Sequence, residues 1–234
     1  MADITIKTGD GSFSGYLATP RGAGDGGRWP GIVVIQEIFG VNATMRALCD
    51  DLAGQGYVAL CPDLFWRTRP GIQLTDKTDA EMEQAFALFK GFNEAKGIDD
   101  LRTALEQLRA NPSCTGKVGG VGYCLGGRLA YLMTTRTAVD CGVGYYGVGI
   151  ENILNEAAAI TKPLLLHIAE EDEYCSKDAQ AKIKQGLGRN AMVTLYSYPG
   201  VGHAFARVGG KHWNAEAARL ANERTAAFFK KHLR

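Results

Sequence analysis

One glycine-rich stretch, GGVGYCLGG over residues 119–127, constrains the fold more than any other part of the chain. An apolar run beginning at Lys117 enters it, and a helical pattern over residues 128–133 leaves it. Strand, G-x-C-x-G and helix in this order form the thiol version of a nucleophile elbow. The positions two before and two after Cys124 pass so close that a Cβ would clash, and Gly122 and Gly126 carry none. The stretch therefore predicts a strained turn between a buried strand and a helix.

The turn gives the thiol of Cys124 a special place. The first turn of a helix has N–H groups without intrahelical partners and the positive end of the helix dipole, and both favour an anion. The thiolate is the attacking form of a cysteine, so this position suits a nucleophile. A buried structural cysteine in a glycine-rich turn is the alternative, and the motif alone leaves it open.

Composition narrows the class of protein. The chain has 234 residues, 46% of them hydrophobic, and no linker or repeat divides it, so we expect one domain over residues 1–234. The 26 basic and 25 acidic side chains give a net charge of +1. No excess of positive charge marks a nucleic-acid or anionic-membrane partner, and no apolar run approaches the ~20 residues of a membrane span. We therefore expect neither nucleic acid nor membrane as a partner.

The six cysteines are scattered, with no C-x-x-C pair, and the first residues have neither the basic nor the apolar region of a signal peptide. This pattern predicts reduced thiols in a cytoplasmic protein rather than a disulfide framework. The scatter and the presence of only four histidines also argue against a zinc site. We expect no metal and no cofactor.

Apolar strands alternate with amphipathic helices along the chain. The expected strands, besides the one entering the elbow, cover residues 4–7, 13–18, 31–35, 57–61, 139–146, 163–168 and 191–198. The expected helices, besides the one leaving the elbow, cover residues 43–54 (capped by Asn42), 80–95 (capped by Asp79), 99–110, 153–160, 176–186 and 214–232. This alternation predicts an α/β fold, a mainly parallel twisted sheet with helices on both faces.

Two segments downstream of the elbow carry further chemistry. After the strand at 163–168 come four adjacent carboxylates, Glu170 to Glu173, and after the strand at 191–198 comes His203 in a glycine-containing loop. In parallel sheets, ligands bind beyond the carboxyl ends of the strands. The order cysteine, acid, histidine is the α/β-hydrolase order of nucleophile, acid and base. Local sequence does not single out one of the four carboxylates.

The other histidines have simpler interpretations. His167 lies within an apolar strand and is expected to be a hydrogen-bonded core residue, while His212 and His232 are expected at the surface.

Four segments together resemble the dienelactone hydrolase (carboxymethylenebutenolidase) family of the α/β-hydrolase superfamily. They are the elbow, QEIFGVN at 36–42, GYYG at 144–147 and GHAFAR at 202–207, and the likeness extends from about residue 6 to residue 229. The resemblance implies an α/β-hydrolase fold and a catalytic triad of Cys124, Asp172 and His203. It also implies an oxyanion hole from the backbone N–H groups of Ile38 and Leu125.

The resemblance implies further roles. Glu37 is expected to partner the resting thiol and to take its proton when an anionic substrate binds. Arg207 matches the position that holds the substrate carboxylate, and the expected substrate pocket also includes Phe39, Tyr146, Met82 and Phe86.

The helix expected at 80–95 departs from the family. Family members that process dienelactone carry an arginine and a tyrosine where this chain has Met82 and Phe86, and their tryptophan position is Phe89. One of the two arginines that hold the substrate carboxylate in those family members is therefore absent here. Arg67 or Arg69 is a candidate replacement. The departure bears on the substrate rather than on the chemistry.

The sequence thus predicts a cofactor-free, monomeric, cysteine-nucleophile hydrolase of small enol-lactones such as dienelactone. Two alternatives stay open at this point. One is a carboxylesterase or lactonase for less polar esters, and the other is a non-hydrolytic homologue that binds ligands or senses oxidants through its thiol.

Overall fold

Strand β5 (Cys114–Tyr123) links two structural units that the chain forms in sequence. The computed structural model describes residues 2–234, and these divide after Gly120. Within these residues, no helix combines the length and the apolarity needed to cross a membrane. The expectation of a single domain stays a prediction.

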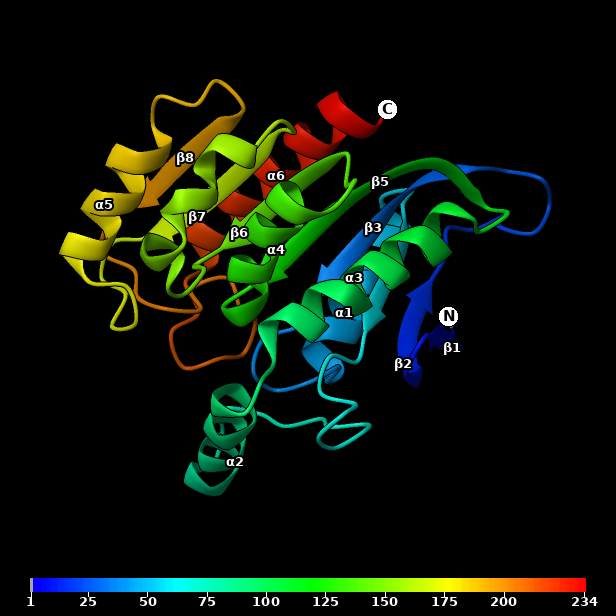
Figure 1. Cartoon of the computed structure of the whole chain (residues 1–234), viewed down its shortest axis with the longest axis horizontal. Coiled ribbons are helices and arrows are strands. Elements are labelled where there is room, and N and C mark those ends of the chain that lie inside the picture. Colours follow the sequence, from blue (N-terminus) through cyan, green and yellow to red (C-terminus); the bar gives the residue numbers. More distant parts are fainter. Residues whose placement is uncertain (1) are drawn as a thin grey trace. The chain divides into compact units, whose positions relative to one another are not determined.

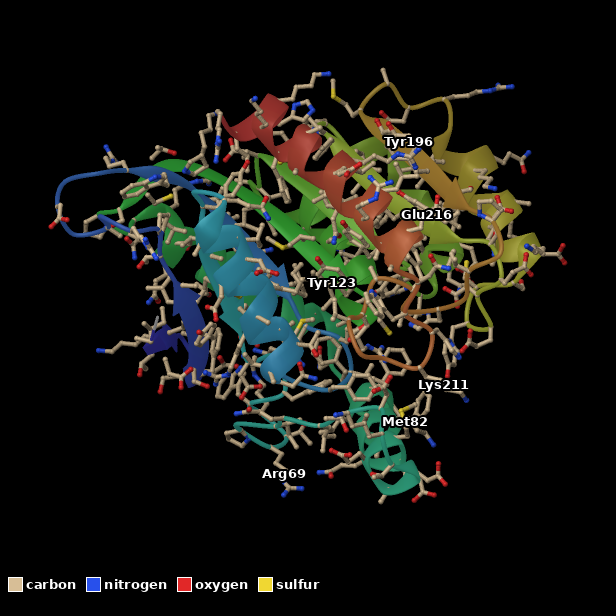
Figure 2. The ribbon with its side chains drawn as sticks, turned by 180° about the vertical axis from the view of Figure 1, so that it is seen from behind. Arg69, Met82, Tyr123, Tyr196, Lys211 and Glu216 are labelled. Carbon is tan, nitrogen blue, oxygen red and sulfur yellow. The ribbon has the colours of Figure 1, made fainter. Side chains whose placement is uncertain are left out.

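The first unit is a mixed sheet with helices on both faces. Its strands are β1 (Ala2–Thr8), β2 (Gly11–Ala18), β3 (Trp29–Ile35) and β4 (Val58–Pro62), and with β5 they stand in the order β1-β2-β4-β3-β5. The β1–β2 hairpin turns between Thr8 and Gly11, β2 pairs antiparallel with β4, and β4 pairs parallel with β3. Helices α1 (Ala43–Gly54) and α3 (Glu94–Arg109) cover opposite faces (Figures 1 and 2). The apolar run of β3 is buried on both sides, as predicted.

The helix predicted over residues 80–95 is wrong in extent, as is the predicted start of the next helix. Helix α2 spans Asp79–Lys90, with Thr78 rather than Asp79 as its N-cap. It ends at its C-cap Gly91, and Asn93 then caps α3. Glycine at a helix end and an Asx cap just beyond it are both helix-boundary signals, and they outweigh the helical spacing of the apolar residues Met82, Phe86, Phe89 and Phe92. Phe92 therefore lies outside α2, where its ring packs edge-on against Phe65 at 5.9 Å between centroids.

The second unit follows from the end of β5. Its elements are α4 (Leu125–Arg136), β6 (Cys141–Tyr145), β7 (Leu164–Ala169), α5 (Lys177–Leu187), β8 (Val193–Tyr198) and α6 (Ala215–Leu233). Strands β6, β7 and β8 are adjacent and parallel. Helix α4 packs on one face, and α6 on the other (Figures 1 and 2). The parallel strands with helices on both faces confirm the predicted α/β class.

Two details of the second unit differ from prediction. Residues 153–160 form no α-helix: two 3₁₀ segments, Ile150–Asn152 and Leu154–Ala159, occupy this part of the chain. In α6 the sequence predicts a buried side of Ala218, Leu220, Phe228 and Phe229, and of these Ala218 and Phe229 are buried whereas Leu220 and Phe228 are only partly so.

Candidate active site

The elbow has the geometry that its glycines predict. Cys124 adopts φ 56° and ψ −115°, a left-handed conformation that costs a non-glycine residue free energy. A Cβ added to Gly122 would lie 1.8 Å from the carbonyl oxygen of Gly126, so only glycine fits there. The end of the strand and the start of the helix therefore approach so closely that position 122 requires glycine.

Backbone hydrogen bonds hold the strained residue in place. The N–H of Cys124 donates to the carbonyl of Tyr145 on β6 at 3.1 Å. Its own carbonyl accepts from Gly127 and Arg128 at 3.0 and 3.2 Å, which starts α4 at Leu125. Cys124 is 7% exposed, and its thiol thus lies at the N-terminus of a 12-residue helix, where an anion is favoured.

Asp172 and His203 come together from two loops of the same unit. Asp172 follows β7, His203 follows β8, and His203 Nδ1 lies 2.9 and 3.1 Å from the two carboxylate oxygens of Asp172. The Asp172 side chain is 1% exposed and that of His203 is 6% exposed. Because a carboxylate accepts, Nδ1 carries the hydrogen, and Nε2 on the other side of the ring is the nitrogen left for proton transfer.

The His203 ring is electrostatically coupled to the cysteine. Burial lowers the pKa of the imidazole, but the negative charge of Cys124 and the hydrogen bond to Asp172 outweigh burial and raise the pKa to about 10. Nε2 is buried and has no hydrogen bond of good geometry within residues 2–234. A carboxylate, an imidazole and a thiol in this series can hold the ring in one tautomer and move a proton to and from sulfur.

Backbone strain gathers around these residues. In residues 2–234, the non-glycine residues with positive φ are Cys124, Tyr146 and Ala204. Tyr146, at the end of β6, places its ring 5.1 Å from that of His203, and Ala204 follows His203 in the chain. Strained residues persist where the surrounding structure over-determines them, which is common at functional sites.

The structure distinguishes the four adjacent carboxylates. Asp172 contacts the His203 ring, whereas Glu173 accepts the backbone N–H of His203 at 3.4 Å. Glu171 forms a surface ion pair with Lys177 at 2.8 Å, and its backbone N–H donates to Val201. The loops that carry the acid and the histidine are therefore tied together at several points.

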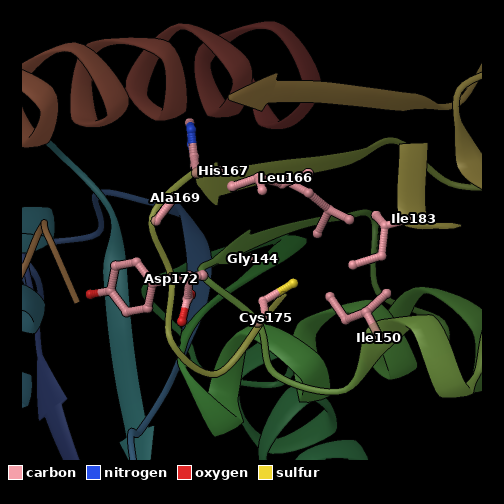
Figure 3. Close-up of a pocket in the computed structure, with 11 residues that line it drawn as sticks. Gly144, Ile150, Leu166, His167, Ala169, Asp172, Cys175 and Ile183 are labelled. Carbon is pink, nitrogen blue, oxygen red and sulfur yellow. The ribbon is translucent and has the colours of Figure 1, made fainter. Parts of the chain in front are cut away.

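A small pocket lies behind Asp172, lined also by Cys175, Ile150 and Ile183 (Figure 3). Its volume of about 10 Å³ suits a single water molecule and no substrate. Burial, followed by the charges of Asp172 and Glu151, raises the pKa of Cys175 to about 12. The thiol of Cys175 is thus protonated and a poor nucleophile at neutral pH.

Two more residues of the second unit, Arg207 and Tyr174, belong to the loops that carry His203 and Asp172. Arg207 is partly exposed and lies in the loop after His203, and its predicted substrate-binding role stays a prediction. Tyr174, which sequence reasoning missed, places its ring 4.8 Å from that of His203. Its position two residues after Asp172 was the only signal in the sequence.

Three predicted residues follow β3 in the first unit. Glu37, Ile38 and Phe39 are all buried, at 1%, 6% and 2% exposure. The side chain of Gln36 accepts the N–H of Leu64 at 3.0 Å and donates to the carbonyl of Glu37 at 3.3 Å. The segment is thereby fixed against the loop after β4, and the predicted roles of these three residues stay predictions.

The candidate replacements for the absent arginine behave differently from each other. Arg67 pairs with the buried Asp100 and, at 3.0 Å, with Asp10, and its guanidinium stacks on Trp66. Arg67 is therefore already neutralised within the first unit. Arg69 is exposed and extends away from the ribbon (Figure 2). On α2, Met82 is half-buried and Phe86 is exposed.

The predictions for the other histidines hold. His167 is buried, with hydrogen bonds from its two nitrogens to the hydroxyls of Tyr198 and Thr225 at 2.7 and 2.9 Å. Burial lowers its pKa to about 3, so it is a neutral core histidine. His212 is partly exposed, and so is His232.

Comparison with known proteins identifies the relatives of this chain. The sequence model of the "Dienelactone hydrolase family" matches residues 13–233. The chain is 52% identical over its whole length to an Azospirillum brasilense protein of the same extent, which is named provisionally as a carboxymethylenebutenolidase. It is 41% identical to carboxymethylenebutenolidase 1 of Cupriavidus pinatubonensis, over 95% of this chain and 93% of that protein. A solved structure from Klebsiella pneumoniae, named provisionally as a dienelactone hydrolase, superimposes with a TM-score of 0.87 and 26% identity over 98% of both chains.

The α/β-hydrolase fold follows from these matches, and so does the class of reaction, hydrolysis of ester or lactone bonds. A non-hydrolytic homologue, left open by the sequence, therefore has no support. The elbow, the acid and histidine loops and the full-length matches lead to one conclusion: the chain belongs to the dienelactone hydrolase family.

Proposed function

We propose that this protein hydrolyses small enol-lactones such as dienelactone through a Cys124–His203–Asp172 triad and an acyl-enzyme. The observation that carries the proposal is the series of thiol, imidazole and buried carboxylate within the second unit. The names of the curated relatives support the substrate class, because several are carboxymethylenebutenolidases.

In the first half of the proposed reaction, the thiolate of Cys124, beside the His203 imidazolium, attacks the lactone carbonyl carbon. The ring C–O bond then breaks, the enolate oxygen takes a proton from the imidazolium, and a thioester remains on Cys124. The backbone N–H of Leu125, at the start of α4, is the proposed oxyanion donor of this unit, and one such donor typically contributes ~3–4 kcal/mol.

In the second half, His203 takes a proton from water, and the hydroxide attacks the thioester carbonyl. The C–S bond breaks, the carboxylic acid leaves, and the thiolate of Cys124 is restored beside the His203 imidazolium, which keeps the proton taken from water. Asp172 holds Nδ1–H of the ring throughout, so that Nε2 faces the reacting atoms.

The remaining predicted residues belong to the same proposal. Arg207 would bind a carboxylate of the substrate, and Phe39, Tyr146, Met82 and Phe86 would line the pocket. The family roles of Glu37 and Ile38 are proposed with them. We further propose that the enzyme is a cytoplasmic monomer, and size-exclusion chromatography tests its oligomeric state.

A second candidate function is the hydrolysis of less polar esters or lactones, and the apolar side chains of α2 favour it. Phe86 and Phe89 are 41% and 38% exposed there, and neither they nor Met82 can pair with an anion. A panel of lactones with and without a carboxylate separates the two candidates by their ratio of kcat/KM.

The test of the mechanism is turnover of this panel by the wild type, Cys124→Ala and Cys175→Ala. Loss of the nucleophile is expected to lower kcat by at least ~10³-fold. Cys175→Ala removes a thiol that is protonated at neutral pH, and we expect its rates to stay near those of the wild type. Equal rates for the wild type and Cys124→Ala would refute the proposal.

A further inference from the structure

Tyr174 is a large aromatic residue left half exposed beside the candidate catalytic histidine. It is 46% exposed, and its ring stands edge-on to that of His203, with 4.8 Å between centroids and 80° between planes. A partly exposed tyrosine presents both an apolar ring and a polar hydroxyl at the surface, and either can contact a ligand. Its place against His203 puts that surface next to the reacting groups.

The position of Tyr174 is fixed by the carboxylate that also holds the histidine. Its backbone N–H donates to Asp172 Oδ1 at 2.8 Å, the oxygen that lies 3.1 Å from His203 Nδ1. The next residue, Cys175, donates its N–H to the carbonyl of Asp172 at 3.3 Å. Tyr174 is therefore held at both its backbone and its ring, rather than swinging freely at the surface.

The charges around the hydroxyl favour a hydrogen-bond donor. Burial, together with the negative charges of Glu173, Cys124 and Asp172, raises the pKa of Tyr174, and the positive charge of Arg207 opposes this effect. The phenol thus keeps its proton at neutral pH and can donate it in a hydrogen bond. The guanidinium of Arg207, in the loop after His203, carries N–H donors and no acceptor atom.

A substrate anion would meet negative charge at this end of the unit. Asp172 and Glu173 lie on either side of the His203 residue, one at its ring and one at its backbone N–H. A carboxylate bound here needs donors that offset this repulsion, and hydrogen bonds to charged groups contribute ~1.5–3 kcal/mol each.

We propose that Tyr174 is a specificity-determining residue, whose hydroxyl donates to a carboxylate of the substrate beside the guanidinium of Arg207. This inference rests on the proposed function and names the side chain that would select carboxylate-bearing lactones. The hydroxyl would act on substrate binding, while the ring would keep its contact with His203.

The test compares two substrates that differ only in charge: an enol-lactone carboxylate and its methyl ester. For Tyr174→Phe, we expect kcat/KM for the carboxylate to fall by ~10-fold or more, mainly through KM, because the contact is made before and during the reaction. For the methyl ester, we expect a change of less than about twofold. Phenylalanine keeps the ring contact, so the variant isolates the hydroxyl.

The matched control is Tyr196→Phe on β8, where Arg224 lies over the ring at 3.9 Å. It removes a hydroxyl from the same unit, and we expect no change in the ratio of the two substrates. In a double-mutant cycle with Arg207→Met, we expect the two losses on the carboxylate to be non-additive, since both donors would contact one anion.

Two results would overturn the inference: an equal loss on both substrates, which marks a structural role, or no loss on either. Failure of the proposed function looks different. In that case Cys124→Ala would match the wild type on both substrates, whatever the effect of Tyr174→Phe.

Discussion

At the scale of single residues, strain and its relief define the site. The sequence predicts the strain at Cys124 because glycines flank it at fixed spacing. It does not predict the positive φ of Tyr146 or Ala204, since neither residue type favours that conformation. Their strain is imposed by the fold, through contacts such as the 2.8 Å hydrogen bond from the Tyr146 N–H to the carbonyl of His167.

Gly122→Ala is the direct test of the elbow. The added methyl group would lie 1.8 Å from the Gly126 carbonyl oxygen, so backbone must move. We expect the free energy of unfolding to fall by ~2–4 kcal/mol, with loss of activity, in urea denaturation. Gly54→Ala, at the end of α1, is the control, since nothing lies within 4 Å of its added Cβ. A Gly122→Ala protein as stable and active as the control would contradict the elbow geometry.

The raised pKa of His203 predicts how stability depends on pH. A pKa raised from 6.5 to about 10 in the folded state means that the folded protein binds a proton more tightly than the unfolded chain does. The stabilisation is complete below pH 6.5 and is lost as the pH rises toward 10. We expect the free energy of unfolding to fall across this range by up to ~1.4 kcal/mol per pH unit.

Urea denaturation at several pH values between neutral and alkaline checks this. His203→Gln removes the titrating group, and its curve should be flatter than that of the wild type. The same slope in both proteins would show that His203 does not carry the dependence.

At the scale of elements, the helix caps explain why the predicted start of α1 is correct and the predicted start of α3 is wrong. Asn42 lies between a strand signal and a clear helical run, and α1 begins after it as predicted. Asn93 directly follows the apolar residues of the helix predicted over 80–95, so the sequence predicts that this helix runs past it. The structure shows a cap here instead, because Asn93 accepts the Lys96 N–H at 3.1 Å at the start of α3.

These two caps should differ in their contribution to stability. Asn42 is buried, accepts the Met45 N–H at 3.1 Å and donates to the carbonyl of Leu74 at 2.8 Å. Asn42→Ala should lower the free energy of unfolding by ~2–3 kcal/mol, because it leaves a buried carbonyl unpaired besides losing the cap. The cap at Asn93 is exposed, and Asn93→Ala should cost ~0.5–1 kcal/mol. Equal losses in thermal or urea unfolding would contradict this ranking.

At the scale of the molecule, the sequence predicts the order of the candidate catalytic groups along the chain, but it does not predict which side chains they contact. Strand ends in an α/β fold predict where Cys124 and His203 lie. The choice of Asp172 among four carboxylates depends on loops 31 residues apart, and local sequence carries no signal for it. Nor does the sequence show that Arg67, a candidate replacement for the absent arginine, forms an ion pair with Asp100 in the fold.

The central claim is that Cys124 carries the acyl group. The most direct measurement is mass spectrometry of protein quenched in acid during turnover of an activated ester, with peptide mapping of the adduct. We predict one acyl group on Cys124, more of it in His203→Gln if deacylation slows more than acylation, and none in Cys124→Ala. A wild-type enzyme with no adduct, alongside a Cys124→Ala variant that turns over the ester at the wild-type rate, would contradict the account.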